Sequence, residues 1–351
     1  MADVFDYLRS NSDKLFTEIN DIDVLIFNRI SYFPLEEVMS FSEKITIHDA
    51  YLRCVSLSSS LYSSKKDIKL FKIISNSNRY KDLYISNVES KFSTINEEQF
   101  MAVVIHLPND YLYISYRGTT SDLVGWKEDF NMAYMMGTPS QIDAVDYLKK
   151  INIDKTIYLG GHSKGGNLAM YAAMYSSQII KDKIEKVYNF DGPGFINLDE
   201  FYYSIRDKIV SYIPTCSIIG RLFYLDNPYI VVRSSYNRIW QHSVYSWQID
   251  RDNFIISELD YESDRIKRIL DEWLNKTSFE ERRDFVNEVY KILIASGVSK
   301  ISEFNVLDLK RIILSYSKMD NDKKQLLIEV IGYLLESTKE NIILDIYDKK
   351  W

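Results

Sequence analysis

The sequence predicts an α/β fold with a mainly parallel sheet flanked by helices. Runs rich in β-branched and aromatic residues alternate with helical patterns between about residues 100 and 215, which is typical of parallel strands joined by helices. One such run, at 156–159, leads through the sequence GHSKG at 161–165 into a helical stretch at 167–174. After about residue 258 the pattern becomes helical, so we expect a C-terminal helical block.

The individual elements follow from local patterns. The first forty residues read as helical, with a helix over 21–32, a break at Pro34 and a short second helix. The mixed segment 65–85 is expected to hold the first strands. Strands are predicted over 100–107, 111–117, 156–159, 186–190, 210–213, 229–233 and 244–249, the first two as a hairpin around Pro108-Asn109-Asp110. Helices are predicted over 141–150, 167–174, 199–209, 263–275, 279–296, 306–317 and 322–339.

Composition restricts the class of protein. The 351 residues are 46% hydrophobic and 26% charged, with a net charge of −7, which is ordinary for a soluble globular protein. Acidic and basic residues are interspersed, so nucleic acid is not an expected partner. Cys54 and Cys216 lie far apart and give neither a disulfide framework nor metal-ligand spacing. We expect a cytoplasmic protein without metal or organic cofactor; the sequence does not indicate its oligomeric state.

No targeting or transmembrane segment is expected. The N-terminus lacks the basic and apolar regions of a signal peptide. The longest apolar run, at 326–335, contains Glu329 and Gly332 and is shorter than the roughly 20 residues that cross a bilayer. Two domains are predicted: 1–258, an α/β domain that includes the N-terminal helices, and 259–351, a helical extension or cap.

The sequence at 161–165 has the form G-x-S-x-G in a strand–turn–helix context, which is the pattern of a nucleophile elbow. A serine in a strained turn needs small neighbours, because two chain segments approach closely there. Gly161, Gly165 and Gly166 supply that room. The following helix points backbone N–H groups toward any oxyanion formed beside the hydroxyl. We therefore expect Ser163 to be a nucleophile.

An activated serine needs a base, and the base needs an orienting acid. In the chain order Ser, acid, His, only one of the four histidines, His242, follows Ser163, so His242 is the predicted base. His162 is expected to pack or form hydrogen bonds, His106 to belong to the core, and His48 has no supporting context.

Asp191 is the predicted acid, because it closes the strand at 186–190 and active sites of α/β proteins gather at such strand ends. Asp226, which precedes Asn227-Pro228, is the alternative. An oxyanion hole needs two N–H donors, of which one is expected from the backbone of Lys164. The other is expected from Thr119 or Thr120, in the loop that follows the second hairpin strand.

These residues resemble a known family. The aromatic-R-G-T run at 116–119, the W-x-x-D of Trp126 and Asp129, and the GHSKGG at 161–166 resemble the class 3 lipases over about residues 100–245. The GHSKGGN form at 161–167, together with QHS at 241–243, is similar to a bacterial branch catalogued as a domain of unknown function. The resemblance implies an α/β-hydrolase fold, a Ser/Asp/His triad and fatty-acid esters as substrates. It carries Ser163 over as nucleophile, Thr119 as oxyanion donor and His242 as base.

Two positions depart from the family pattern. Class 3 lipases usually have Leu after the serine, where this chain has Lys164. Its cation either favours an anionic substrate or transition state, or it points to solvent or pairs with an acidic neighbour. Class 3 lipases also carry their acid in an N-D-x-V-P stretch, and the matching stretch at 214–219 has Ser217 where Asp is expected. Asp191 resembles instead the placement in pancreatic-type lipases.

The expected function is hydrolysis of a carboxylic ester, small-molecule or lipid, through an acyl-enzyme. A thioester or amide substrate is also compatible with fold and triad. The alternative is a catalytically silent binding or scaffold protein, an idea that Ser217 in the family's acid position favours. The apolar segments 132–136 and 218–225 are expected either to line an acyl pocket, to act as a lid, or to pack in the core.

Overall fold

The computed structural model describes residues 2–151 and 153–295. In these residues a large sheet has eight strands in chain order: β1 (Lys44–Thr46), β2 (Tyr84–Ser93), β3 (Glu98–Leu107), β4 (Tyr111–Tyr116), β5 (Thr156–His162), β6 (Ile184–Phe190), β7 (Ile209–Pro214) and β8 (Tyr229–Val232). Strands β4 to β8 are parallel to their neighbours, and β1 to β4 are antiparallel. The predicted mainly parallel α/β sheet is confirmed. A small antiparallel pair is formed by β9 (Ile249–Asp250) and β10 (Asn253–Phe254).

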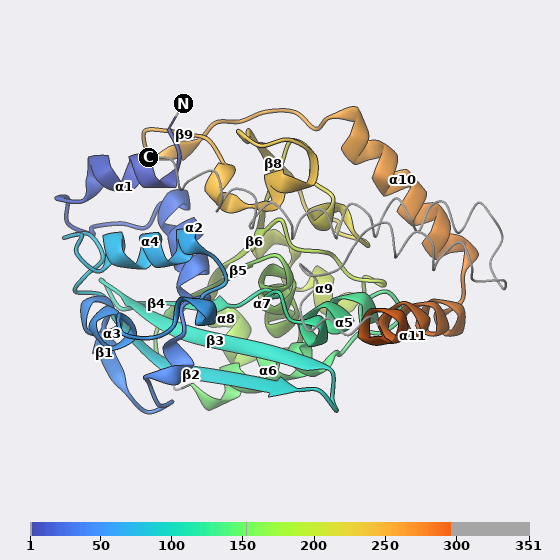
Figure 1. The fold of residues 1–351 in the computed structure, drawn as a ribbon, viewed down its shortest axis with the longest axis horizontal. Coiled ribbons are helices and arrows are strands. Elements are labelled where there is room, and N and C mark those ends of the chain that lie inside the picture. The colour runs from blue at the N-terminus through green and yellow to red at the C-terminus, as the bar shows by residue number, and fades with distance from the viewer. Residues whose placement is uncertain (1, 152, 296–351) are drawn as a thin grey trace.

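Helices connect and cover the strands (Figure 1). The α-helices are α1 (Val4–Asn11), α2 (Asp21–Ile30), α3 (Ile47–Cys54), α4 (Lys65–Ile74), α5 (Leu123–Asn131), α6 (Pro139–Lys150), α7 (Lys164–Tyr175), α8 (Gln178–Lys183), α9 (Glu200–Tyr203), α10 (Tyr261–Lys276) and α11 (Phe279–Ala295). Short 3₁₀ turns are η1 (Leu35–Glu37), η2 (Ser59–Leu61), η3 (Arg206–Lys208), η4 (Ile219–Arg221), η5 (Arg238–His242) and η6 (Val244–Ser246).

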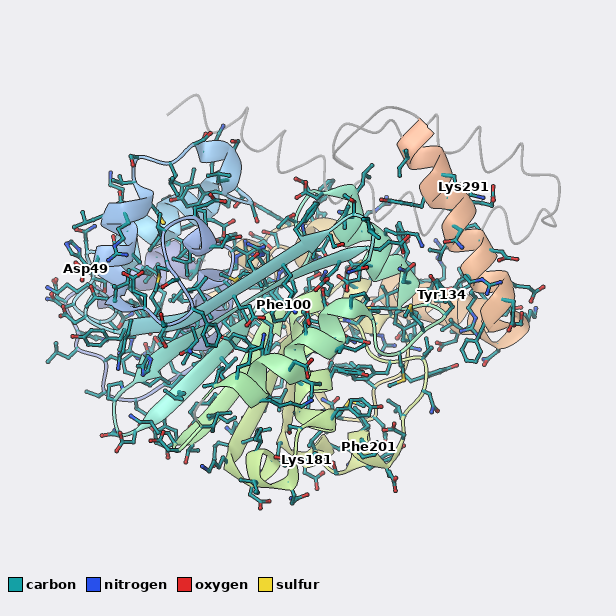
Figure 2. All side chains as sticks on the ribbon, turned by 90° about the horizontal axis from the view of Figure 1, so that it is seen from below. Asp49, Phe100, Tyr134, Lys181, Phe201 and Lys291 are labelled. Atoms are coloured by element: carbon teal, nitrogen blue, oxygen red, sulfur yellow. The ribbon has the colours of Figure 1, made fainter. Side chains whose placement is uncertain are left out.

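The two faces of the sheet bury different helices, as the alternation along β3 shows. Met101, Val103 and Ile105 pack into a core with residues of α1 to α4, whereas Phe100, Ala102 and Val104 pack into a second core with residues of α6 and α7. Figure 2 labels Phe100 on the face that the green helices cover. Successive side chains of a strand point to opposite faces, and the apolar run 100–105 of β3 is therefore buried on both sides of the sheet.

Local signals start the helices that frame the candidate site. α6 begins with a capping box, in which Thr138 and Gln141 satisfy each other's backbone N–H groups, and with Pro139 in its first turn. α7 differs, because Ser163 stands at its N-cap position and no side chain caps this helix. The N-terminal N–H groups of α7 are therefore not taken up by a capping side chain.

The C-terminal part of the described chain packs on the loops at the carboxyl ends of the strands. Ile266 and Leu270 of α10 form a buried cluster with Ile218 and Ile239. Leu274 of α10 packs in a neighbouring cluster from the segments 132–133 and 222–223. α11 packs against α5, as Figure 1 also shows. The apolar segments 132–136 and 218–225 thus contribute to packing beneath α10, in agreement with one of the three predicted roles.

Most predicted elements are confirmed, including the hairpin of β3 and β4, and α6, α7, α10 and α11. The strand predicted at 244–249 is wrong, because the chain winds into the 3₁₀ turn η6 there and only Ile249 pairs in β9. The helix predicted at 199–209 shrinks to α9 and η3. The segment 65–85 holds α4 and only the start of β2, and the first strand, β1, lies earlier in the chain. The helices predicted at 306–317 and 322–339 lie outside the described residues, and the division at residue 258 stays a prediction.

Candidate active site

Ser163 sits in a strained turn between β5 and α7. Its backbone has φ 59° and ψ −133°, a region that non-glycine residues rarely adopt and that is characteristic of a nucleophile elbow. A Cβ on Gly161 would lie 2.2 Å from the carbonyl carbon of Gly165, and a Cβ on Gly165 would lie 2.1 Å from the oxygen of Tyr116. The segments before and after the serine therefore approach too closely for any side chain, as the glycine pattern predicts.

Asp191 and His242 form a hydrogen bond between the carboxylate Oδ2 and the imidazole Nδ1, 2.7 Å apart. Asp191 directly follows β6 and is fully buried, while the His242 side chain is about 20% exposed. The other carboxylate oxygen accepts hydrogen bonds from the Ser217 hydroxyl (2.5 Å) and from the Gly220 backbone N–H (3.1 Å). A carboxylate with these donors holds the imidazole in the tautomer with the proton on Nδ1.

His162 connects the elbow to the loop that carries His242. Its Nε2 donates to the backbone oxygen of His242 at 2.8 Å, and the two rings lie with centroids 4.5 Å apart. Burial lowers the pKa of His162 well below its ordinary range, and the charge of His242 acts in the same direction. His162 is thus a neutral hydrogen-bonding residue, as predicted. The described structure contains no hydrogen bond between the Ser163 hydroxyl and the His242 ring.

The loop after β4 brings Thr119 and Thr120 to the same end of the sheet. The Thr119 hydroxyl donates to Asp129 of α5 at 2.6 Å. The Thr120 N–H donates to the side chain of Gln99 at 3.0 Å, so this N–H already has a partner. A third contact joins the loop to the N-terminal helices, since the Gly118 N–H donates to the Tyr32 hydroxyl at 3.0 Å.

Asp129 is a carboxylate with an unusual environment. Burial raises the pKa of Asp129 to about 6, against the opposing effects of the Lys164 charge and the Thr119 hydrogen bond. Its Oδ1 is buried and has no hydrogen-bond partner within the described residues, while Oδ2 accepts the Thr119 bond. The W-x-x-D pattern marks this residue in the sequence, but its contact with Thr119 is visible only in the structure.

The Lys164 side chain turns inward rather than to solvent. Its Nζ donates to Glu128 of α5 at 2.7 Å and to the backbone oxygen of Gln99 at 2.9 Å. Both side chains of the pair are essentially buried, at 1% and 0% exposure. Pairing with an acidic neighbour, one of the roles predicted for Lys164, is confirmed. The sequence does not predict the role of Glu128, because Glu128 occupies an unspecified position inside the W-x-x-D pattern.

The remaining candidates lie elsewhere. Asp226, the alternative acid, is about 56% exposed and pairs with Arg206. His106 is hydrogen-bonded to Ser86 on β2, and His48 to the backbone of Ser75. The parts of the chain that the structure describes contain no group of three or more His, Cys, Asp or Glu arranged to hold a metal ion. Of the helices at 2–151 and 153–295, none combines the length and apolar character of a bilayer span.

Solved structures that are similar to parts of this chain include lipases. The crystal structure of M37 lipase is 17% identical, covers 58% of this chain and 70% of its own, and has a TM-score of 0.36. A fungal lipase is 14% identical, with 69% and 88% covered and a TM-score of 0.41. The Rhizomucor miehei lipase propeptide complex is 12% identical, with 74% and 78% covered and a TM-score of 0.39.

The described residues themselves have the mostly parallel sheet, the flanking helices and the sharp turn at Ser163 after β5 that the sequence predicts for an α/β-hydrolase fold. No curated protein matches the sequence significantly. A family model does match it, over residues 74–291, which is more than half of the chain, and the protein therefore belongs to the Mbeg1-like family.

Proposed function

We propose that this protein is a cytoplasmic serine hydrolase that cleaves the carboxylic ester of a small molecule or lipid through an acyl-enzyme. The observation that carries the proposal is the buried Asp191 carboxylate bonded to His242, next to a serine in a strained elbow. These three residues occur in the chain order of α/β-hydrolases, with the nucleophile first and the base last.

The proposed acid–base chemistry follows from the tautomer of His242. With its proton on Nδ1 bound to Asp191, the imidazole presents the Nε2 lone pair to the Ser163 hydroxyl. Ser163 attacks the ester carbonyl as its proton moves to His242, which then donates this proton to the leaving alcohol. Water releases the acid through the same base. The absence of a Ser163–His242 hydrogen bond is compatible with this scheme, because such bonds are often loose before substrate binds.

Two backbone N–H groups are proposed to bind the oxyanion. One belongs to Lys164, the first residue of α7, where no side chain caps the helix. The other is assigned to Thr119 rather than Thr120, because the Thr120 N–H already donates to Gln99. The Thr119 hydroxyl, held by Asp129, fixes the rotation of that residue. Donors that are oriented before the reaction stabilise the developing charge without reorganisation.

Partly buried apolar residues near the base support an acyl group as part of the substrate. Trp126 and Phe130 of α5, Ile219 and Leu222 of the loop 218–225, and Trp240, two residues before His242, border one buried cluster. Apolar surface beside a few polar groups is typical of small-molecule sites. We therefore place the acyl chain along the exposed parts of these side chains, beside α10.

Variants of the three proposed catalytic residues test this function. Hydrolysis of p-nitrophenyl esters of graded chain length is expected to fall by about 10³-fold or more in Ser163→Ala, Asp191→Asn and His242→Ala, because members of a triad act as a unit. Asp226→Asn is the matched control and is expected to keep wild-type turnover, since Asp226 is exposed and pairs with Arg206. Turnover that persists in Ser163→Ala, or that is lost only in Asp226→Asn, would contradict the assignment.

A fluorophosphonate probe distinguishes the hydrolase from the alternative of a silent scaffold. Labelling of Ser163, located by peptide mass spectrometry and lost in His242→Ala, supports an activated serine. Folded wild-type protein that neither labels nor hydrolyses esters, thioesters or amides would favour the scaffold. The rates on matched ester, thioester and amide substrates define the reaction class.

A further inference from the structure

We infer that Lys164 and Glu128 form a positioning pair that holds the oxyanion loop (residues 117–122) and α5 against the nucleophile elbow. The inference rests on the proposed function, which it deepens. It concerns the position where the sequence departs from class 3 lipases, immediately after the nucleophile. The Lys164 side chain neither faces solvent nor points to a substrate; it reaches inward to Glu128 and to the backbone of β3.

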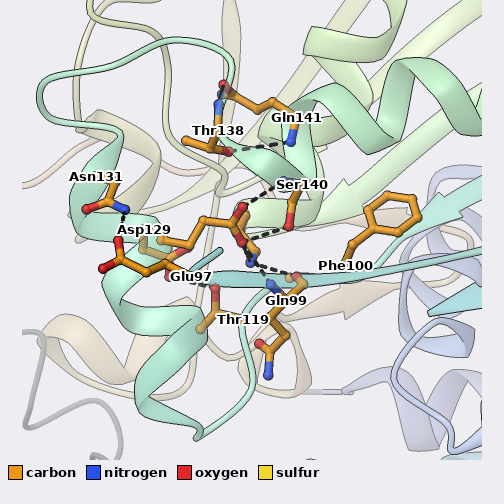
Figure 3. Close-up of polar contacts among 12 residues, drawn as sticks. Glu97, Gln99, Phe100, Thr119, Asp129, Asn131, Thr138, Ser140 and Gln141 are labelled. Atoms are coloured by element: carbon orange, nitrogen blue, oxygen red, sulfur yellow. Dashed lines mark hydrogen bonds and ion pairs between the residues drawn. The ribbon is translucent and has the colours of Figure 1, made fainter. Parts of the chain in front are cut away.

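The Glu128 carboxylate is a junction between four elements. Its Oε1 accepts the Ser140 N–H at 2.7 Å, and its Oε2 accepts the Ser140 hydroxyl at 2.7 Å, the Gln99 N–H at 3.2 Å and Lys164 Nζ at 2.7 Å. Glu128 lies on α5, Ser140 on α6, Gln99 on β3 and Lys164 on α7. Figure 3 labels Gln99, Ser140, Thr119 and Asp129 in the polar cluster around this pair. Every polar atom of the pair therefore has charged, hydroxyl or backbone partners.

Stability alone does not account for this arrangement. Two buried charges lose their hydration, and an apolar pair of similar volume often stabilises a protein at least as well. A cation in the first turn of α7 also opposes the helix dipole. The ion pair instead fixes the relative positions of the elements that carry its partners, because all of its hydrogen bonds can be satisfied only in a narrow range of geometries.

Two routes lead from the pair to the oxyanion loop. Along α5, Glu128 is followed by Asp129, which holds the Thr119 hydroxyl. Across β3, the Gln99 N–H donates to Glu128 and the Gln99 oxygen accepts from Lys164. The Gln99 side chain in turn accepts the Thr120 N–H at 3.0 Å and donates to the Thr120 hydroxyl at 2.7 Å. Removing the Lys164 cation takes away the hydrogen bonds to both Glu128 and Gln99, whereas the backbone N–H of residue 164 remains.

The pair also controls the charge beside Thr119. The groups that face Asp129 are Lys164 of α7, whose charge lowers its pKa, Glu128 of α5, which raises it, His242 of η5, which lowers it, and Thr119, whose hydrogen bond lowers it. Without the Lys164 cation the pKa of Asp129 rises further. A protonated Asp129 no longer requires Thr119 to donate, so the loop loses its fixed orientation at a higher pH than in the wild type.

Lys164→Met tests the inference, with Lys127→Met as the matched control. Lys127 precedes Glu128 on α5 and is also 1% exposed, but its Nζ contacts Glu97, Asn131 and Asn287 rather than the elbow. We expect Lys164→Met to lower kcat on p-nitrophenyl butyrate about 30- to 100-fold. This decrease does not exceed the decrease in kcat that removal of one oxyanion-hole donor typically causes. KM should stay within about 3-fold, because substrate binding contacts are kept. The acid limb of the kcat profile should move up by about one pH unit.

Amide hydrogen exchange supplies a readout that does not depend on activity. Peptides covering 117–122 should exchange at least about 10-fold faster in Lys164→Met than in the wild type, because the loop opens locally. Lys127→Met should leave kcat and the exchange of residues 117–122 within about 3-fold of wild type, even if it lowers the melting temperature by as much as Lys164→Met does. Equal losses of kcat and protection in the two variants would reduce Lys164 to a stability role and overturn the inference.

A milder variant covers the case in which Lys164→Met does not fold. Ser140→Ala removes one donor from Glu128 Oε2 and keeps the ion pair; we expect kcat to fall about 3- to 10-fold at unchanged KM, with faster exchange at 117–122. Unchanged kcat and exchange would overturn the inference. If the wild type neither hydrolyses esters nor reacts with a fluorophosphonate, the proposed function fails. Exchange in the same variants then still decides whether the pair holds the loop.

Discussion

Ser217 occupies the position where class 3 lipases carry their acid, and its hydroxyl donates to Asp191, which follows the preceding strand. Ser217 therefore helps to hold the Asp191 side chain in place through this hydrogen bond. A hydroxyl bound to a buried carboxylate contributes more than an ordinary hydrogen bond. The serine at this position is compatible with hydrolysis and does not by itself favour the scaffold.

Ser217→Ala is expected to lower kcat about 10-fold with little change in KM, because a charged hydrogen bond of about 1.5–3 kcal/mol orients the acid. Steady-state kinetics on a p-nitrophenyl ester measures this. Ser211→Ala serves as control, since the Ser211 hydroxyl is buried in β7 and accepts a hydrogen bond from Asn227 rather than contacting the Asp191 carboxylate. Wild-type kcat in Ser217→Ala would mean that Gly220 alone suffices to hold Asp191.

For individual residues, the sequence predicts candidate site residues from their type and their position at a strand end, but it does not predict their hydrogen-bond partners. The elbow, the scarcity of histidine and a strand end point to Ser163, His242 and Asp191. The Asp191–Ser217 bond joins residues 26 positions apart, and the Lys164–Glu128 pair joins residues 36 apart. Such contacts depend on the order of the strands in the sheet and on the conformation of the loops. Local residue patterns predict neither property.

At the scale of elements, α10 explains how the C-terminal helices attach to the sheet domain. Its apolar residues Ile266, Leu270 and Leu274 are buried at helical intervals. The first turn of this helix contacts Ser217, the hydrogen-bond partner of Asp191, since the Ser263 hydroxyl donates to the backbone oxygen of Ser217 at 2.5 Å. α10 thus covers the loops that carry both Asp191's partner and the proposed acyl-binding residues.

Leu270→Ala is expected to lower the free energy of unfolding by about 2–4 kcal/mol, because it leaves a cavity between α10 and the loop 218–225. Glu272→Ala on the exposed side of α10, where Glu272 is 62% exposed and pairs with Lys276, should change it by less than about 0.5 kcal/mol. Urea unfolding of both variants provides the comparison. Equal stabilities would show that α10 is not packed on the domain as described.

Helices and strands are predicted best where one local sequence pattern is much clearer than any alternative. The β3–β4 hairpin has two apolar runs around a turn, and α7 follows the elbow without interruption. The segment 244–249 is buried at every position, so no alternation exists to distinguish a strand from a wound turn. There the Trp247 indole donates to the Gln241 oxygen and closes the turn. The sequence does not reveal α4, although Ser64 caps it, because its apolar residues resemble a mixed strand pattern.

At the scale of the whole molecule, the N-terminal helices are part of the site's framework. Arg29 of α2 and Asp67 of α4 form a buried pair 2.6 Å apart, to which Tyr245 of η6 adds a hydrogen bond. Tyr32, just after α2, accepts the Gly118 N–H of the oxyanion loop. The chain before residue 74, which the family model does not cover, therefore contacts the loop after β4 at Gly118 and the turn η6 that follows His242.

The free energy of unfolding should depend on pH, because burial shifts the pKa values of two histidines and one glutamate. The histidine shifts and the glutamate shift change the stability in opposite directions. Burial lowers the pKa of His106 to about 4, and the charges of Lys44 and Lys155 act in the same direction. The unfolded chain binds this proton below about pH 6.5, whereas the folded chain does not until about pH 4, so His106 makes stability fall as pH decreases through this window. His162 acts in the same direction. Burial raises the pKa of Glu98 to about 7, which makes stability rise as pH falls.

Replacing one histidine separates these opposing contributions. Relative to wild type, His106→Gln should gain about 2 kcal/mol of unfolding free energy between pH 6.5 and pH 4, somewhat less than the full shift because the ring is only partly buried. The difference between the two proteins should change by less than about 0.2 kcal/mol between pH 7 and 8, where the histidine is mostly neutral in both states. Urea unfolding at each pH measures it, with Glu98 and Asp129 present in both proteins and therefore cancelling. A difference that does not change below pH 6.5 would mean that His106 binds its proton equally in the folded and unfolded chain, with β3 open to water at that position.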